Sequence, residues 1–135
     1  MLREMPDHWE LKLSLPARSE NLARIRRAVS DFAESLGVEG DLVADVRLAV
    51  NEACTNVIRH AYMLGDGDVK VEARPVGDSL VVVVHDRGRG LAHASENPGS
   101  GYGLRVAGAL ATSMEVRRRE TGTEVQLAFP LGQAA

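Results

Sequence analysis

The sequence has 135 residues, a formal net charge of −3, 26% charged residues and 44% hydrophobic residues. This balance excludes an intrinsically disordered chain and argues against a nucleic-acid binder, which normally carries a basic face. Cys54 is the only cysteine, so an internal disulfide is excluded. With no signal peptide and no apolar run long enough for a membrane span, we expect residues 1–135 to form one soluble, cytoplasmic domain.

The first part of the chain predicts a strand and then a helix. Residues 9–15 alternate apolar and polar side chains, which is the period of a half-buried strand, and Pro16 is expected to end it. Ser19 is expected to cap a helix, and Gly37 and Gly40 are expected to close that helix. The apolar stripe of this helix, at spacings of three and four, consists of Leu22, Ile25, Val29, Phe32 and Leu36.

A second helix is predicted from about Asp41 to Tyr62, and a hairpin follows it. Residues 65–68 form a turn, residues 69–74 alternate as a strand, and residues 76–79 turn the chain back. The five consecutive apolar residues 80–84 predict a strand that is buried on both faces. The stripe of the second helix consists of Val46, Val50, Ala53, Val57 and Ala61.

The last third predicts a loop, a helix and a second hairpin. Residues 86–101 are rich in Gly, Asn, Ser and Pro, and residues 103–113 follow as a helix. Residues 114–119 and 123–131 form the final hairpin around Thr121-Gly122. The order of strand, two helices, two strands, loop, helix and two strands predicts an α/β fold. We expect a two-layer sandwich with a mixed, mostly antiparallel sheet and its helices on one face.

The second helix carries a line of polar residues. Glu52, Asn56 and His60 are spaced by four, so they advance about 40° per step and share one narrow face beside the apolar stripe. A glutamate there can accept a proton, and an asparagine oxygen can ligate Mg²⁺. The alternative interpretation is a solvated polar face.

A second motif, Asp86-x-Gly88-x-Gly90, directly follows the buried strand. Ligands of α/β sheets tend to lie beyond the carboxyl ends of strands. A carboxylate in this place can accept a hydrogen bond from the amino group of adenine, and the glycines permit close approach of a flat ring. The alternative interpretation is a plain turn.

Two further glycine-containing motifs begin regular elements. Gly101 and Gly103 open the third predicted helix, where exposed amide groups can bind phosphate. The alternative there is a flexible loop before a helix. Gly122-Thr123 begins the final strand and by itself indicates only a hairpin turn.

In this order the four motifs resemble the N, G1, G2 and G3 boxes of the GHKL ATPases. The stretch Asn51-Glu52-Ala53-Cys54-Thr55-Asn56-Val57-Ile58-Arg59-His60-Ala61-Tyr62 is especially similar to the anti-sigma-factor serine kinases. The resemblance runs from about Leu11 to Phe129. It implies a two-layer α/β sandwich that binds ATP between its helices, beneath a flexible lid.

The resemblance also implies roles for individual residues. Glu52 would be the general base, Asn56 would hold Mg²⁺ against the phosphates, and Asp86 would recognise adenine. Arg59 could contact phosphate or lie on the surface, and His60 could line the pocket or be a buried structural residue. The other implied nucleotide contacts are Gly88 and Gly90 beneath the ring, Gly101 and Gly103 at the phosphates, and Thr123 on the base side.

Members of this branch bind a sigma factor and phosphorylate a serine or threonine of an anti-anti-sigma antagonist of the STAS type. They are commonly homodimers. The resemblance therefore implies these partners, with no direct nucleic acid and no membrane. Arg18 and Arg24 match the partner-facing segment of the family, although exposed arginines are more often merely solvated.

The lid, Leu91 to Ser100, departs from the family pattern because it is short and contains no Lys or Arg. A missing cation removes one source of transition-state stabilisation, unless Arg87, Arg89 or a partner's arginine replaces it. The alternative function is therefore an ATP-gated interaction module with little or no kinase activity. A detached histidine-kinase catalytic domain is disfavoured, because the sequence leaves no room for the helical hairpin that would carry its phosphoacceptor histidine. A metalloprotein is disfavoured because no His, Cys or carboxylate cluster has the spacing of metal ligands.

Overall fold

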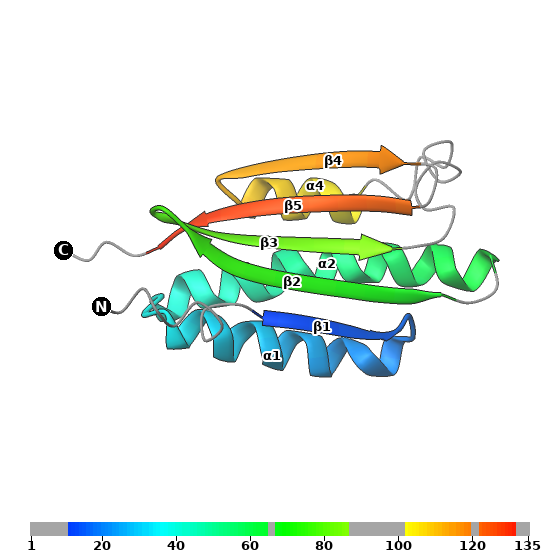
Figure 1. The fold of residues 1–135 in the computed structure, drawn as a ribbon, viewed down its shortest axis with the longest axis horizontal. Coiled ribbons are helices and arrows are strands. Elements are labelled where there is room, and N and C mark those ends of the chain that lie inside the picture. The colour runs from blue at the N-terminus through cyan, green and yellow to red at the C-terminus, as the bar shows by residue number, and fades with distance from the viewer. Residues whose placement is uncertain (1–10, 65–66, 87–101, 120–121, 132–135) are drawn as a thin grey trace.

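The computed structural model describes residues 11–64, 67–86, 102–119 and 122–131. Figure 1 shows the elements in their spatial arrangement. In chain order they are β1 (Leu11–Pro16), the 3-10 helix η3 (Ser19–Asn21), α1 (Leu22–Ser35), α2 (Gly40–Leu64), β2 (Asp68–Val76), β3 (Ser79–Asp86), α4 (Tyr102–Leu110), β4 (Ser113–Arg119) and β5 (Gly122–Pro130).

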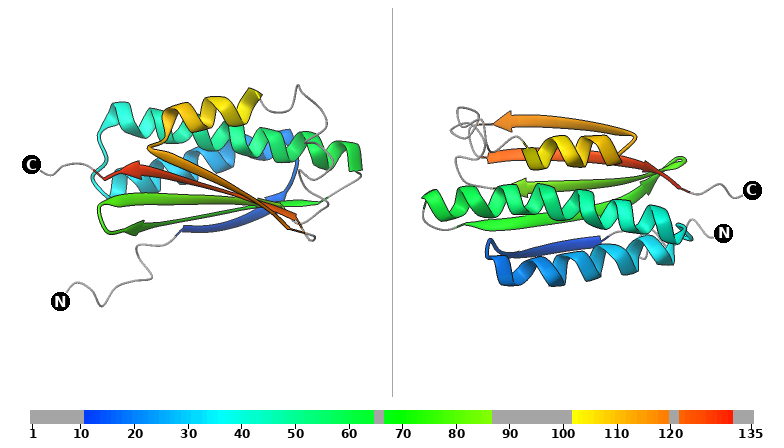
Figure 2. Two further views of the ribbon diagram at one scale, coloured as in Figure 1. Left: turned by 90° about the horizontal axis from the view of Figure 1, so that it is seen from above. Right: turned by 180° about the vertical axis from the view of Figure 1, so that it is seen from behind.

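The strands form one five-stranded sheet in the order β1-β2-β3-β5-β4. All four pairings between the described strands are antiparallel. The helices α1, α2 and α4 lie on the same face of this sheet (Figure 2). The predicted two-layer α/β sandwich is therefore confirmed, with antiparallel pairing throughout the part of the chain that the structure describes.

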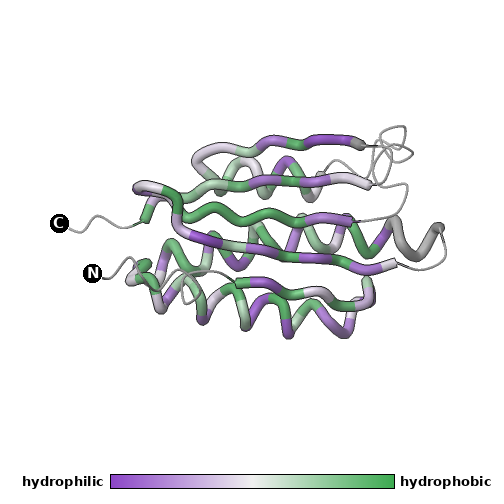
Figure 3. The backbone as a smooth tube through the Cα atoms, in the orientation of Figure 1, coloured by the Kyte–Doolittle hydropathy of each residue, from purple (hydrophilic) through white to green (hydrophobic). Residues whose placement is uncertain are grey.

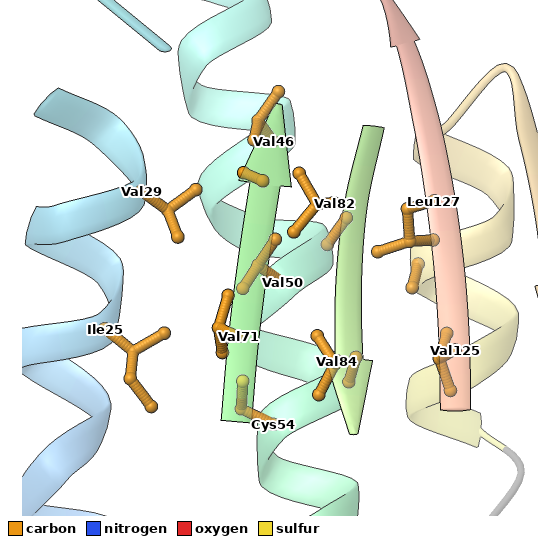
Figure 4. Close-up of a cluster of buried hydrophobic side chains, with 14 of the residues drawn as sticks. Ile25, Val29, Val46, Val50, Cys54, Val71, Val82, Val84, Val125 and Leu127 are labelled. Carbon is orange, nitrogen blue, oxygen red and sulfur yellow. The ribbon is translucent and has the colours of Figure 1, made fainter. Parts of the chain in front are cut away.

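The core lies between the sheet and the helices, and Figure 3 shows hydrophilic and hydrophobic residues alternating along β2. Alternate residues of β2, β3 and β5 face the helix layer and are buried, except Pro75 and Asp86, which are half-buried. Burying one such side chain stabilises a fold by about 1.5–3 kcal/mol, so this layer dominates stability. Figure 4 labels the central members, which are Ile25, Val29, Val46, Val50, Cys54, Val71, Val82, Val84, Val125 and Leu127.

The prediction that β3 is buried on both faces is wrong. Leu80, Val82 and Val84 are buried against the helices, whereas Val81 and Val83 on the other face are only half-buried. None of the described elements covers that outer face, so among the described residues only neighbouring side chains of the sheet shield it. An unbroken apolar run therefore does not require a second covering layer here.

Three predicted helix boundaries also need correction. Ser19 is not the cap of the long helix but the first residue of η3, and the side-chain nitrogen of Asn21 donates to the Pro16 carbonyl at 2.8 Å. Gly37 does end α1, with a left-handed φ of 86°, but Gly40 begins α2. The third helix ends at Leu110, because Ser113 already pairs in the sheet.

None of the helices within the described residues combines the length and the apolar character needed to cross a membrane.

Candidate functional site

The polar face of α2 borders the core, as predicted. Asn56 is buried, with 4% of its surface exposed, and Glu52 one turn earlier is half-buried. Arg59 is exposed on the same helix, and the side chain of His60 lies outside the described residues. A buried amide with a half-buried carboxylate beside it is unusual for a merely solvated face.

Glu52 lies against the first turn of α4. A Cβ atom built on Gly103 would stand 3.1 Å from Glu52 Oε1 and 3.4 Å from the Glu52 carbonyl oxygen. Only a glycine leaves full space for this carboxylate at the start of α4. The structure therefore brings together Glu52 and Gly103, which the sequence had assigned to the base and the phosphate contacts.

The residue before Glu52 is held by two neighbouring side chains. Arg26 of α1 donates from Nη1 to Asn51 Oδ1 at 3.0 Å. The Thr55 hydroxyl donates to the Asn51 carbonyl oxygen at 2.7 Å, a bond of the kind that slightly bends helices. The turn that carries Glu52 and Asn56 is therefore tied to α1 and locally shaped by Thr55.

Asp86 and Thr123 meet on the helix-facing side of the sheet, at the end of β3. They are directly paired between β3 and β5, and Asp86 accepts a hydrogen bond from the Thr123 backbone N–H. Burial raises the pKa of Asp86 to about 6, although this hydrogen bond and the nearby His85 act in the other direction. The two residues predicted to hold the base are therefore brought together at the end of β3.

His85 points to the outer face of the sheet, away from this site. Its Nε2 lies 3.3 Å from Glu72 Oε1, and its Nδ1 lies 3.8 Å from Glu124 Oε1. The three side chains line a shallow groove over β2, β3 and β5. This groove lies on the face opposite the helices, so it is separate from Glu52, Asn56 and the helix-facing Asp86.

Several predicted contacts fall outside the described residues. These are Gly88, Gly90 and Gly101, together with Arg87, Arg89 and the whole lid from Leu91 to Ser100. Their predicted roles therefore remain predictions.

The described part of the site fits a nucleotide with its magnesium ion. Within it, no group of three or more His, Cys, Asp or Glu side chains is arranged to hold a metal. A Mg²⁺ ion would therefore depend on the Asn56 amide oxygen and on nucleotide phosphates, which is a usual arrangement for this ion. The half-buried carboxylate of Asp86 would suit the base, and the glycine space beside Glu52 would suit the phosphates.

Sequence reasoning missed Arg26, Asn51 and Thr55 as parts of this site. The Thr55 bond could have been expected, because a helical threonine often bonds the carbonyl four residues earlier. The Arg26–Asn51 bond joins two helices, and no local spacing indicates it.

One known family covers most of the chain. The family model described as the histidine kinase-like ATPase domain matches residues 15–129. The chain therefore belongs to the histidine kinase-like ATPase domain family.

Its relatives include proteins named serine-protein kinase RsbW. The protein of Bacillus licheniformis is 36% identical over 89 residues, which are 64% of this chain and 54% of the relative. The protein of Halalkalibacterium halodurans is 37% identical over 79 residues, which are 58% and 48% of the two chains. The chain thus spans about half the length of the curated relatives it matches.

A solved structure shares the fold. It is the crystal structure of the RsbU and RsbW domains of Rv1364c from Mycobacterium tuberculosis. The match has a TM-score of 0.75 at 25% identity and covers 93% of this chain and 33% of the other.

Proposed function

We propose that this protein is an ATP-binding anti-sigma regulator of the cytoplasm. It sequesters a sigma factor and phosphorylates a serine or threonine of an anti-anti-sigma antagonist of the STAS type. The observation that carries the proposal is the contact of the Glu52 carboxylate with Gly103 at the start of α4. It brings a proton acceptor next to a helix start, where amide groups favour phosphate.

Each end of the nucleotide has a candidate partner. Asp86 and Thr123 would hold adenine at the end of β3, and the Asn56 amide oxygen would hold Mg²⁺, which would supply positive charge for the phosphates. Glu52 would take the proton of the acceptor hydroxyl while the hydroxyl oxygen forms a bond to the terminal phosphorus of ATP. The bond between that phosphorus and the oxygen it shares with the neighbouring phosphate would break, and ADP would leave.

The kinase activity is inferred from the names of the relatives, and the partners are inferred from the family resemblance of the sequence. The matched proteins are named serine-protein kinases RsbW, and the proposal extends their activity to this chain. We also propose a homodimer, which light scattering of the purified protein would test directly. A monomer at all protein concentrations would refute the proposed dimer and would leave the proposed nucleotide binding unaffected.

Two measurements test the central proposal in sequence. First, Mg-ADP at millimolar concentration should raise the unfolding temperature, because a ligand of the folded state stabilises it by mass action. Second, the protein should transfer label from γ-labelled ATP to a serine of a STAS-type antagonist. No thermal shift would refute nucleotide binding, and binding without label transfer would refute the kinase.

The second candidate function is an ATP-gated interaction module with little phosphotransfer. It is favoured by the absence of Lys and Arg between Leu91 and Ser100 in the sequence. A cation at the terminal phosphate contributes more to chemistry than to binding. Complexes with a sigma factor that depend on nucleotide, without label on any antagonist, would support this function over the kinase.

A further inference from the structure

The end of edge strand β4 carries two arginines that lie on opposite faces of the sheet. Met114 Cε would stand 3.1 Å from a Cβ built on Gly108 of α4, so Met114 faces the helix layer. Side chains two residues apart along a strand share a face, so Val116 and Arg118 face the helices as well. Arg117 therefore faces the outer side.

The pairing register places Arg118 in line with Asp86 and Thr123. Arg118 pairs with Thr123 between β4 and β5, and Thr123 pairs with Asp86 between β5 and β3. Directly paired side chains lie on the same face, with Cβ atoms about 5 Å apart. The three residues thus form one row across the helix-facing side at the end of the sheet where β3 ends.

The two arginines differ in their contacts. Arg117 Nη2 lies 3.3 Å from Glu115 Oε1, so its charge is paired on the outer face. Arg118 is exposed, and its side chain forms no ion pair or hydrogen bond with another of the described residues. Figure 3 shows the end of β4 as strongly hydrophilic. An unpaired guanidinium beside a predicted nucleotide site is a natural partner for an anion.

We propose that Arg118 is a further nucleotide-binding residue, whose guanidinium contacts the ribose-phosphate part of an adenine nucleotide. This inference rests on the proposed function, because it requires the base to lie at Asp86 and Thr123. A purine held by Asp86 and Thr123 would lie along this row, and Arg118 would then be the next group beside it. The Arg118 guanidinium would supply a positive charge from the sheet side of the site. This charge belongs to β4 and not to the lid.

Charged residues on edge strands also prevent association between sheet edges. That role does not depend on which face a side chain occupies, so it predicts that substitutions of Arg117 and Arg118 have equal effects on Mg-ADP affinity. The nucleotide role predicts an effect for Arg118 alone. The difference between two neighbouring residues therefore separates the two explanations.

The test is calorimetric titration of Mg-ADP into three proteins, the unsubstituted chain, Arg118→Ala and Arg117→Ala. Both substitutions remove one positive charge from the same strand, so long-range electrostatic effects are matched. Arg118→Ala should weaken Mg-ADP binding about tenfold, whereas Arg117→Ala should stay within about twofold. Unfolding temperatures without nucleotide check that both variants fold. Arg118→Gln, which keeps the length of the side chain and removes its charge, replaces Arg118→Ala if that variant unfolds early.

The outcomes separate this inference from the proposed function. Equal affinities for the unsubstituted chain, Arg117→Ala and the Arg118 variant would overturn the inference and leave nucleotide binding intact. No measurable binding by the unsubstituted chain would overturn the proposed function, and the inference with it. A selective loss with the Arg118 variant would support both.

Discussion

The carboxylate of Glu52 and the backbone of Gly103 touch so closely that a methyl group on Gly103 would stand 3.1 Å from Glu52 Oε1. Gly103→Ala should therefore fold normally, because a carboxylate end can move by a few tenths of an ångström. The displaced carboxylate should slow phosphotransfer by about tenfold or more, since small misplacements of catalytic groups have large effects on rate. Single-turnover label transfer to the antagonist measures this rate.

Gly108→Ala is the matched control on the same helix. Its added Cβ would also stand 3.1 Å from a neighbour, but that neighbour is the flexible end of Met114. Both substitutions replace a helical glycine by alanine and gain up to about 1 kcal/mol of helix propensity. If both variants lose phosphotransfer equally, the contact of Gly103 with Glu52 has no special role.

Glu52→Gln should abolish phosphotransfer and leave nucleotide affinity nearly unchanged. The amide keeps the size of the side chain, but it cannot take a proton from the attacking hydroxyl. Paired measurements of Mg-ADP affinity and single-turnover rate test this prediction. A variant that retains the original rate would show that another group is the base.

Asp86→Asn should stabilise the protein without nucleotide and weaken nucleotide binding. The pKa of Asp86 is raised from 3.8 to about 6, so its ionised form costs the folded state free energy. This shift corresponds to about 3 kcal/mol, which solvent screening of a partly exposed group reduces to about 1 kcal/mol. Stability from this carboxyl group is fully present below pH 3.8 and is lost as the pH rises through about 6.

The variant should therefore unfold at a higher temperature than the original protein at pH 7.5. The difference should shrink as the pH is lowered towards 5, where the original carboxyl group takes up its proton. Thermal unfolding at a series of pH values, without nucleotide, follows this change. A constant difference in unfolding temperature across the series would mean that Asp86 does not change its protonation state in this pH range.

Arg26→Ala should destabilise the fold by about 1–2 kcal/mol, because it removes a partly buried, charged hydrogen bond to Asn51. Arg27→Ala is the control, since Arg27 is exposed on the same helix and its substitution should change stability by less than about 0.5 kcal/mol. Urea unfolding compares the two. Equal stabilities would show that the bond to Asn51 contributes nothing net.

Local sequence patterns predicted the helices and strands, but they did not predict contacts between residues far apart in the sequence. The spacing of Glu52 and Asn56 fixes them on one helix face, and the hairpin at Gly77 follows from its turn residues. The Arg26–Asn51 bond depends instead on how two helices pack, which no periodicity in either helix specifies. The row through Arg118 lies between these cases, because it needs the strand order as well as the predicted hairpin.

Helix ends were predicted less well for a related reason. A serine before an apolar stripe suits a cap, yet Asn21 bonds back to Pro16 and a 3-10 turn comes first. Several polar residues near Ser19 can satisfy the same free backbone groups, so sequence alone does not choose among them. Glu52 and Asn56 lie in the middle of α2, so the uncertainty at helix ends does not change their shared face.

The position of β5 also sets the order in which this molecule can be completed. β5 is the last described strand along the chain, yet it lies between β3 and β4. On the ribosome, α1, α2 and the β2–β3 hairpin emerge and can associate first, while β3 keeps an open edge. Asp86 gains its neighbour Thr123 only when that final strand arrives, so a chain interrupted before Gly122 would have a folded beginning and half a site.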